Sequence, residues 1–239
     1  MTASLTVQPG IFNRLPGLKI LVAVIRNIDP ALVEKEKISQ LLHECWNSAR
    51  MAVAPYPTVQ SHPNIASWRK AYSSLGISVK KFTSSIENLA KRASKVDSTP
   101  RSINPIVDFY NACSLKFLLP FGAFDLDDKD IEQLELRFTK EGDQFHSLDA
   151  IEPENVPMGE ASYVSGNIVV TRHINWKQSK EGLIKDSTSN AVVMAEILSD
   201  ISDEQIRELQ DFFQKTCDEM LKKSPDFFIL TEDSPAVSY

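Results

Sequence analysis

Cysteine is scarce in this sequence, with three residues at Cys45, Cys113 and Cys217. Their number is odd, they lie far apart, and no CxxC pair or Cys/His cluster occurs. The sequence therefore signals neither a disulfide framework nor a structural zinc site. Cys45 and Cys113 fall inside predicted helices, where a small apolar thiol packs in the core. This usage predicts a protein of the reducing cytosol.

Long apolar runs are also missing. The longest, LKILVAVI at residues 18–25, is far shorter than the roughly 20 residues that span a bilayer. The first seventeen residues, MTASLTVQPGIFNRLPG, lack the basic start and apolar stretch of a signal peptide. We therefore expect a cytoplasmic protein without a membrane partner.

The familiar catalytic signatures are absent. The sequence contains no GxGxxG, Walker phosphate loop, HExxH or GxSxG. No motif therefore indicates a dinucleotide-binding enzyme, a P-loop NTPase, a zinc metalloprotease or an α/β-hydrolase. The acidic run at 125–130 lacks the central glycine and distal glutamate of a calcium loop, so we interpret it as a helix cap. The sequence predicts no metal and no cofactor.

Positive charge is in short supply, because 26 Lys and Arg stand against 32 Asp and Glu, for a formal net charge of −6. This balance argues against a strongly basic, non-specific nucleic-acid binder, and DNA is not an expected partner. It leaves room for a local basic groove. The most basic region contains Lys80, Lys81, Lys91, Arg92 and Lys95.

The first half of the chain alternates strand and helix signals. Residues 18–25, rich in Leu, Ile and Val, predict a buried strand. Asp29-Pro30 then predicts an N-cap and first turn for the next helix. Three further helices are predicted at 61–76, 84–95 and 104–119.

Strand signals dominate beyond Pro120. Residues 134–138 alternate apolar and polar, and Ser165-Gly166-Asn167 predicts a hairpin turn. Residues 190–197 fit a strand or a helix by pattern alone. A capped amphipathic helix from Ser202 and a short strand at 227–230 complete the pattern. Without an internal repeat or linker, the simplest prediction is one α+β domain over residues 1–239.

The stretch NPIVDFYNACSLKFLLPFGAFDLDD at 104–128 carries a family resemblance. It is similar to a segment of the editing domain of the bacterial phenylalanyl-tRNA synthetase beta subunit, called the B3/B4 domain. The matching positions are Pro105, Val107, Asp108, Asn111, Pro120, Ala123, Phe124, Asp125 and Asp127. Residues 141–149 and 186–196 resemble two later stretches of that family, the second at Asp186, Thr188 and Asn190. The likeness covers about residues 60–200 and looks closest to a stand-alone branch of the family.

The resemblance implies an α+β fold of layered β-sheets flanked by helices. It places a B3/B4-like core at about 60–200, with an N-terminal strand–helix and a C-terminal helix packed on it. In the synthetase this domain hydrolyses tyrosine wrongly attached to phenylalanine tRNA. The resemblance therefore implies a pocket for an aminoacyl group and a tRNA 3′ end. A second hydrolytic site is useful because an apolar pocket rejects small differences poorly. No other synthetase part fits in this chain, so we do not expect a complete tRNA ligase.

One departure affects the chemistry. The family segment P-x-H-A-F-D reads PFGAFD here, so Gly122 stands where the editing histidine is expected. The family's acidic site residue falls at Glu181 after a one-residue shift. Asn104, Asp108 and Asn111 lie at i, i+4 and i+7 on one helix face, where they either line the pocket or cap the helix and hold loops. These three residues and Glu181 are the candidate catalytic residues.

The candidate substrate-binding residues come from three stretches. Gly122 either permits close approach of a substrate or supplies a positive φ. Residues 172–177 combine cations, a tryptophan and an amide, which suits stacking on Trp176 and phosphate contacts from Arg172 or Lys177. A half-buried strand end with a core tryptophan has the same pattern. The full set is Gly122, Ala123, Phe124, Arg172, His173, Asn175, Trp176, Lys177 and Thr188.

The leading hypothesis is an aminoacyl-tRNA deacylase that binds the tRNA 3′ end and hydrolyses a mischarged ester in trans. The alternative is a module that binds an amino acid, a nucleotide or RNA and has lost the chemistry together with the histidine. A third hypothesis is a hydrolase for small amino-acid esters or amides that uses no RNA.

Overall fold

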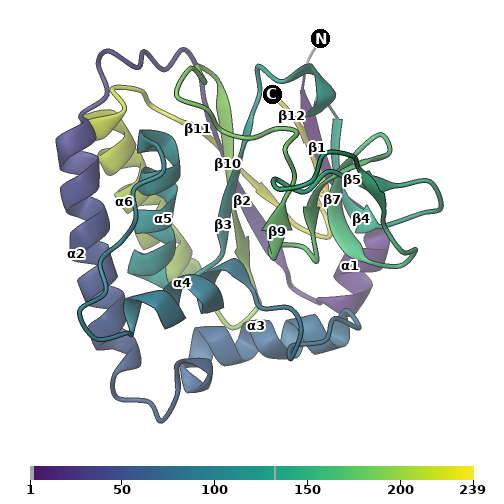
Figure 1. Ribbon diagram of the computed structural model, residues 1–239, viewed down its shortest axis with the longest axis horizontal. Helices are drawn as coiled ribbons and strands as arrows, with labels where there is room; N and C mark the ends of the chain where they lie inside the picture. The colour runs from purple at the N-terminus through teal and green to yellow at the C-terminus, as the bar shows by residue number, and fades with distance from the viewer. Residues whose placement is uncertain (1–2, 132) are drawn as a thin grey trace.

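The structure, a computed structural model, describes residues 3–131 and 133–239 (Figure 1). Its α-helices are α1 (Pro9–Arg14), α2 (Lys35–Val53), α3 (Pro63–Ser74), α4 (Ser85–Ala93), α5 (Pro105–Phe117) and α6 (Asp203–Met220). Two 3₁₀ turns, η1 (Val59–Ser61) and η2 (Lys129–Ile131), lie between them. The strands form two sheets, and the predicted α+β class is confirmed.

The smaller sheet has the order β11-β2-β10-β3, and all its neighbours are antiparallel. Its strands are β11 (Asp226–Leu230), β2 (Lys19–Ile25), β10 (Ala191–Ile197) and β3 (Phe121–Asp125). Strand β2 confirms the strand predicted at 18–25, and β10 resolves the ambiguous stretch at 190–197 in favour of a strand.

The larger sheet has the order β12-β1-β4-β7-β8-β5-β6, with β9 paired to β8. Its strands are β12 (Ala236–Ser238), β1 (Ser4–Val7), β4 (Gln133–Phe138), β7 (Ala161–Ser165), β8 (Ile168–Arg172), β5 (Gln144–Phe145), β6 (Glu154–Asn155) and β9 (Lys177–Gln178). The β7–β8 hairpin turns at the predicted place, between Ser165 and Ile168. The first and last strands pair with each other, which brings the two ends of the described chain together (Figure 1).

The molecule is built in three layers (Figure 1). Helices α2, α5 and α6 cover one face of the smaller sheet, and the larger sheet lies on the other side. The alternation along β2 shows this two-sided burial, because Leu21 and Ala23 pack with the helices whereas Ile20 and Val22 pack with the second sheet. Layered sheets flanked by helices are thus confirmed, and the apolar side chains at the centre between the sheets are withdrawn from water.

The helices follow the predictions with one correction. Asp29-Pro30 does not start α2; Asp29 Oδ1 accepts a hydrogen bond from the amide of Ala31 in a turn, and the helix begins at Lys35. A side chain that satisfies an amide two residues on stabilises a turn as readily as a cap. Elsewhere, Asn104 caps α5 and Ser202 caps α6 with a capping box, as the sequence indicates.

A second correction concerns the residues after Pro120. The sequence suggests a loop containing Gly122, but Phe121–Asp125 forms the edge strand β3, paired with β10 in the register Gly122 to Met194. The acidic residues beyond it hold backbone groups. Asp127 Oδ2 accepts from the amides of Ser189 and Asn190, each at 3.1 Å. Asp127 therefore fastens segments together, whereas Asp128 caps a helical turn, because its Oδ1 accepts a 3.1 Å hydrogen bond from the Asp130 amide in η2.

In the part of the chain that the structure describes, no helix combines the length and the apolar character needed to cross a membrane.

Candidate binding and catalytic cavity

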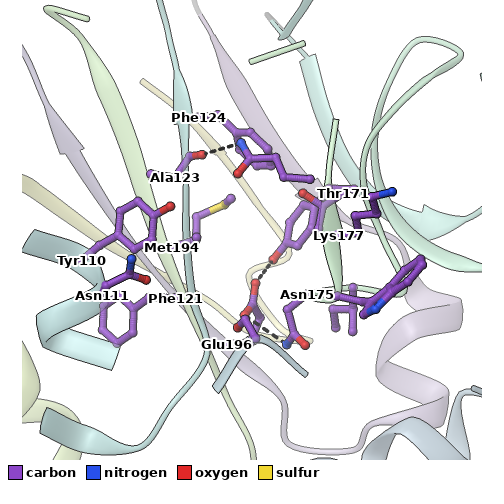
Figure 2. Close-up of a pocket in the computed structure, with 16 residues that line it drawn as sticks. Tyr110, Asn111, Phe121, Ala123, Phe124, Thr171, Asn175, Lys177, Met194 and Glu196 are labelled. Carbon is purple, nitrogen blue, oxygen red and sulfur yellow. Dashed lines mark hydrogen bonds between the residues drawn. The ribbon is translucent and has the colours of Figure 1, made fainter. Parts of the chain in front are cut away.

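A cavity of about 180 Å³ lies between the two sheets, beside the edge strand β3 (Figure 2). A cavity of roughly this size holds a small organic group. The cavity is lined by Ser85, Tyr110, Asn111, Phe121, Gly122, Ala123, Phe124, Tyr163, Thr171, Ile174, Asn175, Trp176, Lys177, Gln178, Met194 and Glu196. These residues come from six places in the chain, so only the tertiary structure assembles the site.

Glu196 is the one carboxylate in the cavity wall. It is 3% exposed on β10, two positions after Met194. Because side chains alternate along a strand, both residues face the larger sheet rather than the helices. Glu196 Oε1 accepts a 2.8 Å hydrogen bond from the Tyr163 hydroxyl, and Oε2 accepts a longer one, 3.4 Å, from Nδ2 of Asn175. Figure 2 shows the carboxylate of Glu196 facing the side chain of Asn175.

A fourth residue extends this network. The Tyr72 hydroxyl, on α3, donates a 2.7 Å hydrogen bond to Oδ1 of Asn175. This contact fixes which end of the Asn175 amide faces Glu196, because the oxygen is taken by Tyr72 and the nitrogen is left to donate. The network therefore joins α3, the smaller sheet and the larger sheet around one buried carboxylate.

Burial changes the acidity of this carboxylate. Withdrawal from water raises the pKa of Glu196 from 4.5 to about 7, against the opposing effect of the bonds from Tyr163 and Asn175. Burial near Glu196 also raises the pKa of Tyr163 and of Tyr72, so both hydroxyls stay protonated as donors. A carboxyl group that exchanges its proton near neutral pH is suited to general base chemistry.

A strained turn delivers Asn175 to the cavity. His173 and Ile174, between β8 and β9, have φ of 47° and 59°. Left-handed backbone is unfavourable for side chains of this size and is most costly for a β-branched residue. The turn is held by Glu160, whose Oε1 accepts from the His173 amide at 3.0 Å. The structure thus maintains an unfavourable backbone where it places an amide against Glu196.

The opposite wall comes from α5 and β3. Tyr110 and Asn111 project from α5 toward Met194 and the space beside it (Figure 2). The cavity is also lined by Ser85 at the start of α4, whose hydroxyl is buried and has no hydrogen-bond partner among the described residues. An unpaired buried hydroxyl in a cavity wall is available to a ligand.

Gly122 supplies open space rather than a special backbone angle. It lies in extended conformation within β3, and a Cβ built on it would have no atom within 4 Å. Since it pairs with Met194, such a Cβ would point to the cavity side of the sheet. Of the two interpretations that the sequence allows, the positive φ is therefore wrong.

The mouth of the cavity carries a cation and an aromatic ring. Lys177 Nζ donates a 2.8 Å hydrogen bond to the Ser147 hydroxyl and lies 5.9 Å from the centre of the Phe145 ring. Trp176 is partly exposed beside it and makes edge contact with Phe82 at 4.6 Å between ring centres. Both side chains line the cavity and remain reachable from solvent.

Seven of the thirteen predicted site residues line this cavity: Asn111, Gly122, Ala123, Phe124, Asn175, Trp176 and Lys177. The other six are outside it. Asn104 Oδ1 accepts from the Val107 amide as the helix cap, and the Asp108 carboxylate accepts from Ser102 and Ile103. Thr188 donates to Asp125 at 2.7 Å. These polar groups are already used in holding chain segments.

The remaining three, Arg172, His173 and Glu181, do not line the cavity. Arg172 is committed to carboxylates, at 2.7 Å from Glu160 and 3.1 Å from Glu154. His173 is buried, and burial lowers its pKa. Glu181 accepts from Ser179 and contacts His146 Nδ1 at 3.1 Å, which fastens the loop after β5. The predicted phosphate contact from Arg172 is therefore unavailable without breaking two ion pairs.

Three residues of the network, Tyr72, Tyr163 and Glu196, were missed from the sequence. Glu196 and Tyr163 show no motif, but Glu196 interrupts the apolar run AVVMAEI. A lone acid in a strand buried on both faces is the signal that would have identified it. No group of three or more His, Cys, Asp or Glu able to hold a metal occurs in the described ranges.

Comparison with known proteins identifies a family to which this sequence is similar. A family profile described as "B3/4 domain" matches residues 67–219. Among solved structures, an N-terminal fragment of the phenylalanyl-tRNA synthetase beta-subunit from Pyrococcus horikoshii is similar at 8% identity and a TM-score of 0.46, covering 95% of this chain and 54% of that chain. This chain thus spans about half the length of that fragment. No curated protein matches the chain.

Proposed function

The chain belongs to the B3/4 domain family, which confirms the family predicted from its residues, and from this membership we propose that it is an aminoacyl-tRNA editing-type deacylase. In this proposal the cavity between the sheets receives the aminoacyl group at a tRNA 3′ end and hydrolyses its ester in trans. The observation that carries the proposal is the buried carboxylate of Glu196 in the cavity wall.

Glu196 is suited to act as the general base. With a pKa of about 7, it is partly ionised at neutral pH and still basic enough to accept a proton from water. Its Oε2 holds only the 3.4 Å bond from Asn175, so lone pairs remain for a water molecule in the cavity. The Tyr163 bond to Oε1 fixes the carboxylate in place.

The reaction then proceeds in two steps. Glu196 takes a proton as the water oxygen bonds to the ester carbonyl carbon, which leaves a negative charge on the carbonyl oxygen. Collapse of this intermediate breaks the bond to the 3′ oxygen, which takes the proton back from Glu196. The products are the free amino acid and the free tRNA hydroxyl. Asn111, Ser85 and Lys177 supply donors around the cavity for the developing oxyanion.

Two features support an extended substrate that enters from outside. Lys177 at the mouth provides a cation for a phosphate, and the partly exposed Trp176 provides a ring for base stacking. Gly122 leaves space where the resembling family has its histidine. The site therefore uses a carboxylate base in place of that histidine.

The test is deacylation of a panel of mischarged tRNAs by purified protein. We expect one or more to be hydrolysed above the buffer rate, and Glu196→Gln to lower that rate by roughly 10²-fold or more, in the range of general base contributions. Glu87→Gln is the control, because Glu87 is also a buried glutamate but pairs with Arg69 and Lys91 and does not line the cavity. No hydrolysis across the whole panel would refute the proposal.

A second candidate is a module that binds without turnover. It is favoured by Gly122, since the histidine of the resembling family is missing. In that case aminoacyl-tRNA would bind and remain intact, and Glu196→Gln would change affinity alone. A further assay uses small amino-acid esters without RNA. Hydrolysis of these esters by a protein that does not hydrolyse aminoacyl-tRNA would indicate a simple esterase.

A further inference from the structure

The chain divides its charge unevenly. Residues 69–101 contain eight Lys and Arg but only two Asp and Glu, a formal +6, whereas the whole chain carries −6. Six of the eight cations are exposed: Lys70, Lys80, Lys81, Arg92, Lys95 and Arg101. None of these six forms an ion pair with another described residue. We call Lys80, Lys81, Arg92 and Lys95 the α4 basic face.

The α4 basic face begins at the cavity. Lys80 and Lys81 directly precede Phe82, whose ring lies 3.9 Å from that of His173 and 4.6 Å from that of Trp176, centre to centre. The Ser85 amide donates a 2.9 Å hydrogen bond to the Asn175 carbonyl, and both residues line the cavity. The segment that carries the first two cations therefore contacts the cavity wall through Phe82 and Ser85.

The face then runs away from the cavity along α4. The helix extends from Ser85 to Ala93, about 13 Å at 1.5 Å per residue, and Arg92 and Lys95 lie at its far end. Below it lies α3 (Figure 1), joined to it by the buried Glu87, which pairs with Arg69 at 2.9 Å and with Lys91 at 2.7 Å. This buried link holds α4, which contains Arg92 and separates Lys80 and Lys81 from Lys95.

We propose that the α4 basic face binds the phosphate backbone of an RNA whose 3′ end enters the cavity. The net charge of −6 would repel a polyanion elsewhere, so unpaired cations beside the cavity select where RNA lies. Arg172, the predicted phosphate contact, is held by Glu160 and Glu154. The α4 basic face therefore supplies the positive charge for the phosphates in its place. The inference rests on the proposed function for the placement of the 3′ end.

The experiment measures binding of a fluorescein-labelled RNA stem with a single-stranded CCA 3′ end at several salt concentrations. The variant carries Lys80→Ala, Lys81→Ala, Arg92→Ala and Lys95→Ala together. The control carries Lys140→Ala and Lys215→Ala, two exposed lysines outside the face. We expect the variant to bind at least tenfold more weakly at 50 mM salt. Its slope of log K against log salt should fall by roughly three, since each phosphate contact contributes about 0.7–0.9.

Hydrolysis of a small aminoacyl-adenosine ester separates this inference from the proposed function. The four-site variant should hydrolyse it at the wild-type rate, because no changed residue lines the cavity. Loss of RNA binding in a protein that hydrolyses nothing would support the face and refute the deacylase. Wild-type affinity and slope in the variant would overturn the inference. Binding to anionic phosphatidylserine vesicles but not to the RNA would overturn it in favour of a membrane surface.

Discussion

The Tyr163 hydroxyl donates a 2.8 Å hydrogen bond to Glu196 Oε1, and the two residues belong to different sheets. Tyr163 is on β7 of the larger sheet and Glu196 is on β10 of the smaller one. This bond holds a carboxylate at the bottom of the cavity and ties the two layers together. Replacing either partner should therefore affect both stability and the acidity of the site.

Stability should depend on pH through Glu196. Its folded pKa is raised from 4.5 to about 7, so the folded protein holds a proton that the unfolded chain releases between these values. Stability is thus lost as pH rises from about 4.5 to 7, by roughly 3 kcal/mol at 1.36 kcal/mol per pH unit. Urea unfolding of wild type and Glu196→Gln across this range measures the effect. Because burial also lowers the pKa of His62 and of His173, stability depends on pH through these groups as well, and the difference between the two proteins is the relevant quantity.

Glu196→Gln should unfold at higher urea than wild type above pH 7 and at similar urea below pH 4.5. Parallel curves for the two proteins over the whole range would contradict the assignment of a raised pKa to this carboxylate.

Substitution of Gly122 should leave the protein folded, but a large side chain at this position should block the cavity. Gly122→Ala is expected to leave the free energy of unfolding within about 0.5 kcal/mol, because the backbone is extended and the space is open. Gly122→Leu should also fold but fill the cavity and abolish turnover or ligand binding. Gly182→Ala is the contrasting control: its φ is +70° and its Cβ would lie 3.0 Å from Ile131. Thermal melts and deacylation rates distinguish these cases.

Asn104→Ala should weaken the fold without altering the chemistry. The substitution removes the α5 cap and the donor to the Ile184 carbonyl, at a cost of about 1–2 kcal/mol. Catalytic rate per folded molecule should stay at the wild-type value, because Asn104 does not line the cavity. A large loss of rate with an unchanged melting temperature would contradict this expectation and support a catalytic role for Asn104. Asn111→Ala, which changes the cavity wall, should give the reverse pattern.

Tyr72→Phe should move the pH profile. Without the 2.7 Å bond from Tyr72, the Asn175 amide is free to rotate and its donation to Glu196 weakens. That donation lowers the pKa of Glu196, so its loss should shift the midpoint of the rate–pH profile upward. Ser73→Ala, on the exposed side of the same helix, is the control and should leave the midpoint in place. A purely structural role for Tyr72 would lower the melting temperature and leave the midpoint unchanged.

Much of the local structure was predictable because its causes are local. The caps at Asn104 and Ser202 and the turn after Ser165 follow from side chains that satisfy nearby backbone groups. The family resemblance also depended on ordered residues in the sequence, and the profile match confirms it. The prediction of a helix cap at Asp29 was wrong because an Asx turn and a helix cap both use a side-chain oxygen to accept from a nearby backbone amide.

The residues of the site were only partly predictable. Local signals did not distinguish Asn111, which lines the cavity, from Asp108 one turn earlier, whose carboxylate holds the chain before α5. Whether a polar helical residue meets a cavity or a loop depends on what packs against it. The catalytic and binding roles of these residues stay predictions, and the variants above test them.

The sequence by itself determined the α+β class, the main helices and strands and the family, because periodicity, capping and ordered motifs are written along the chain. The tertiary structure decided the site. The pKa of Glu196 is raised because β10 lies between two layers that remove water from it, whereas Tyr163 and Asn175 hold the carboxylate in place from the side of the larger sheet. Acidity of this kind depends on burial and on distant partners, and neither is recorded at any single position of the sequence.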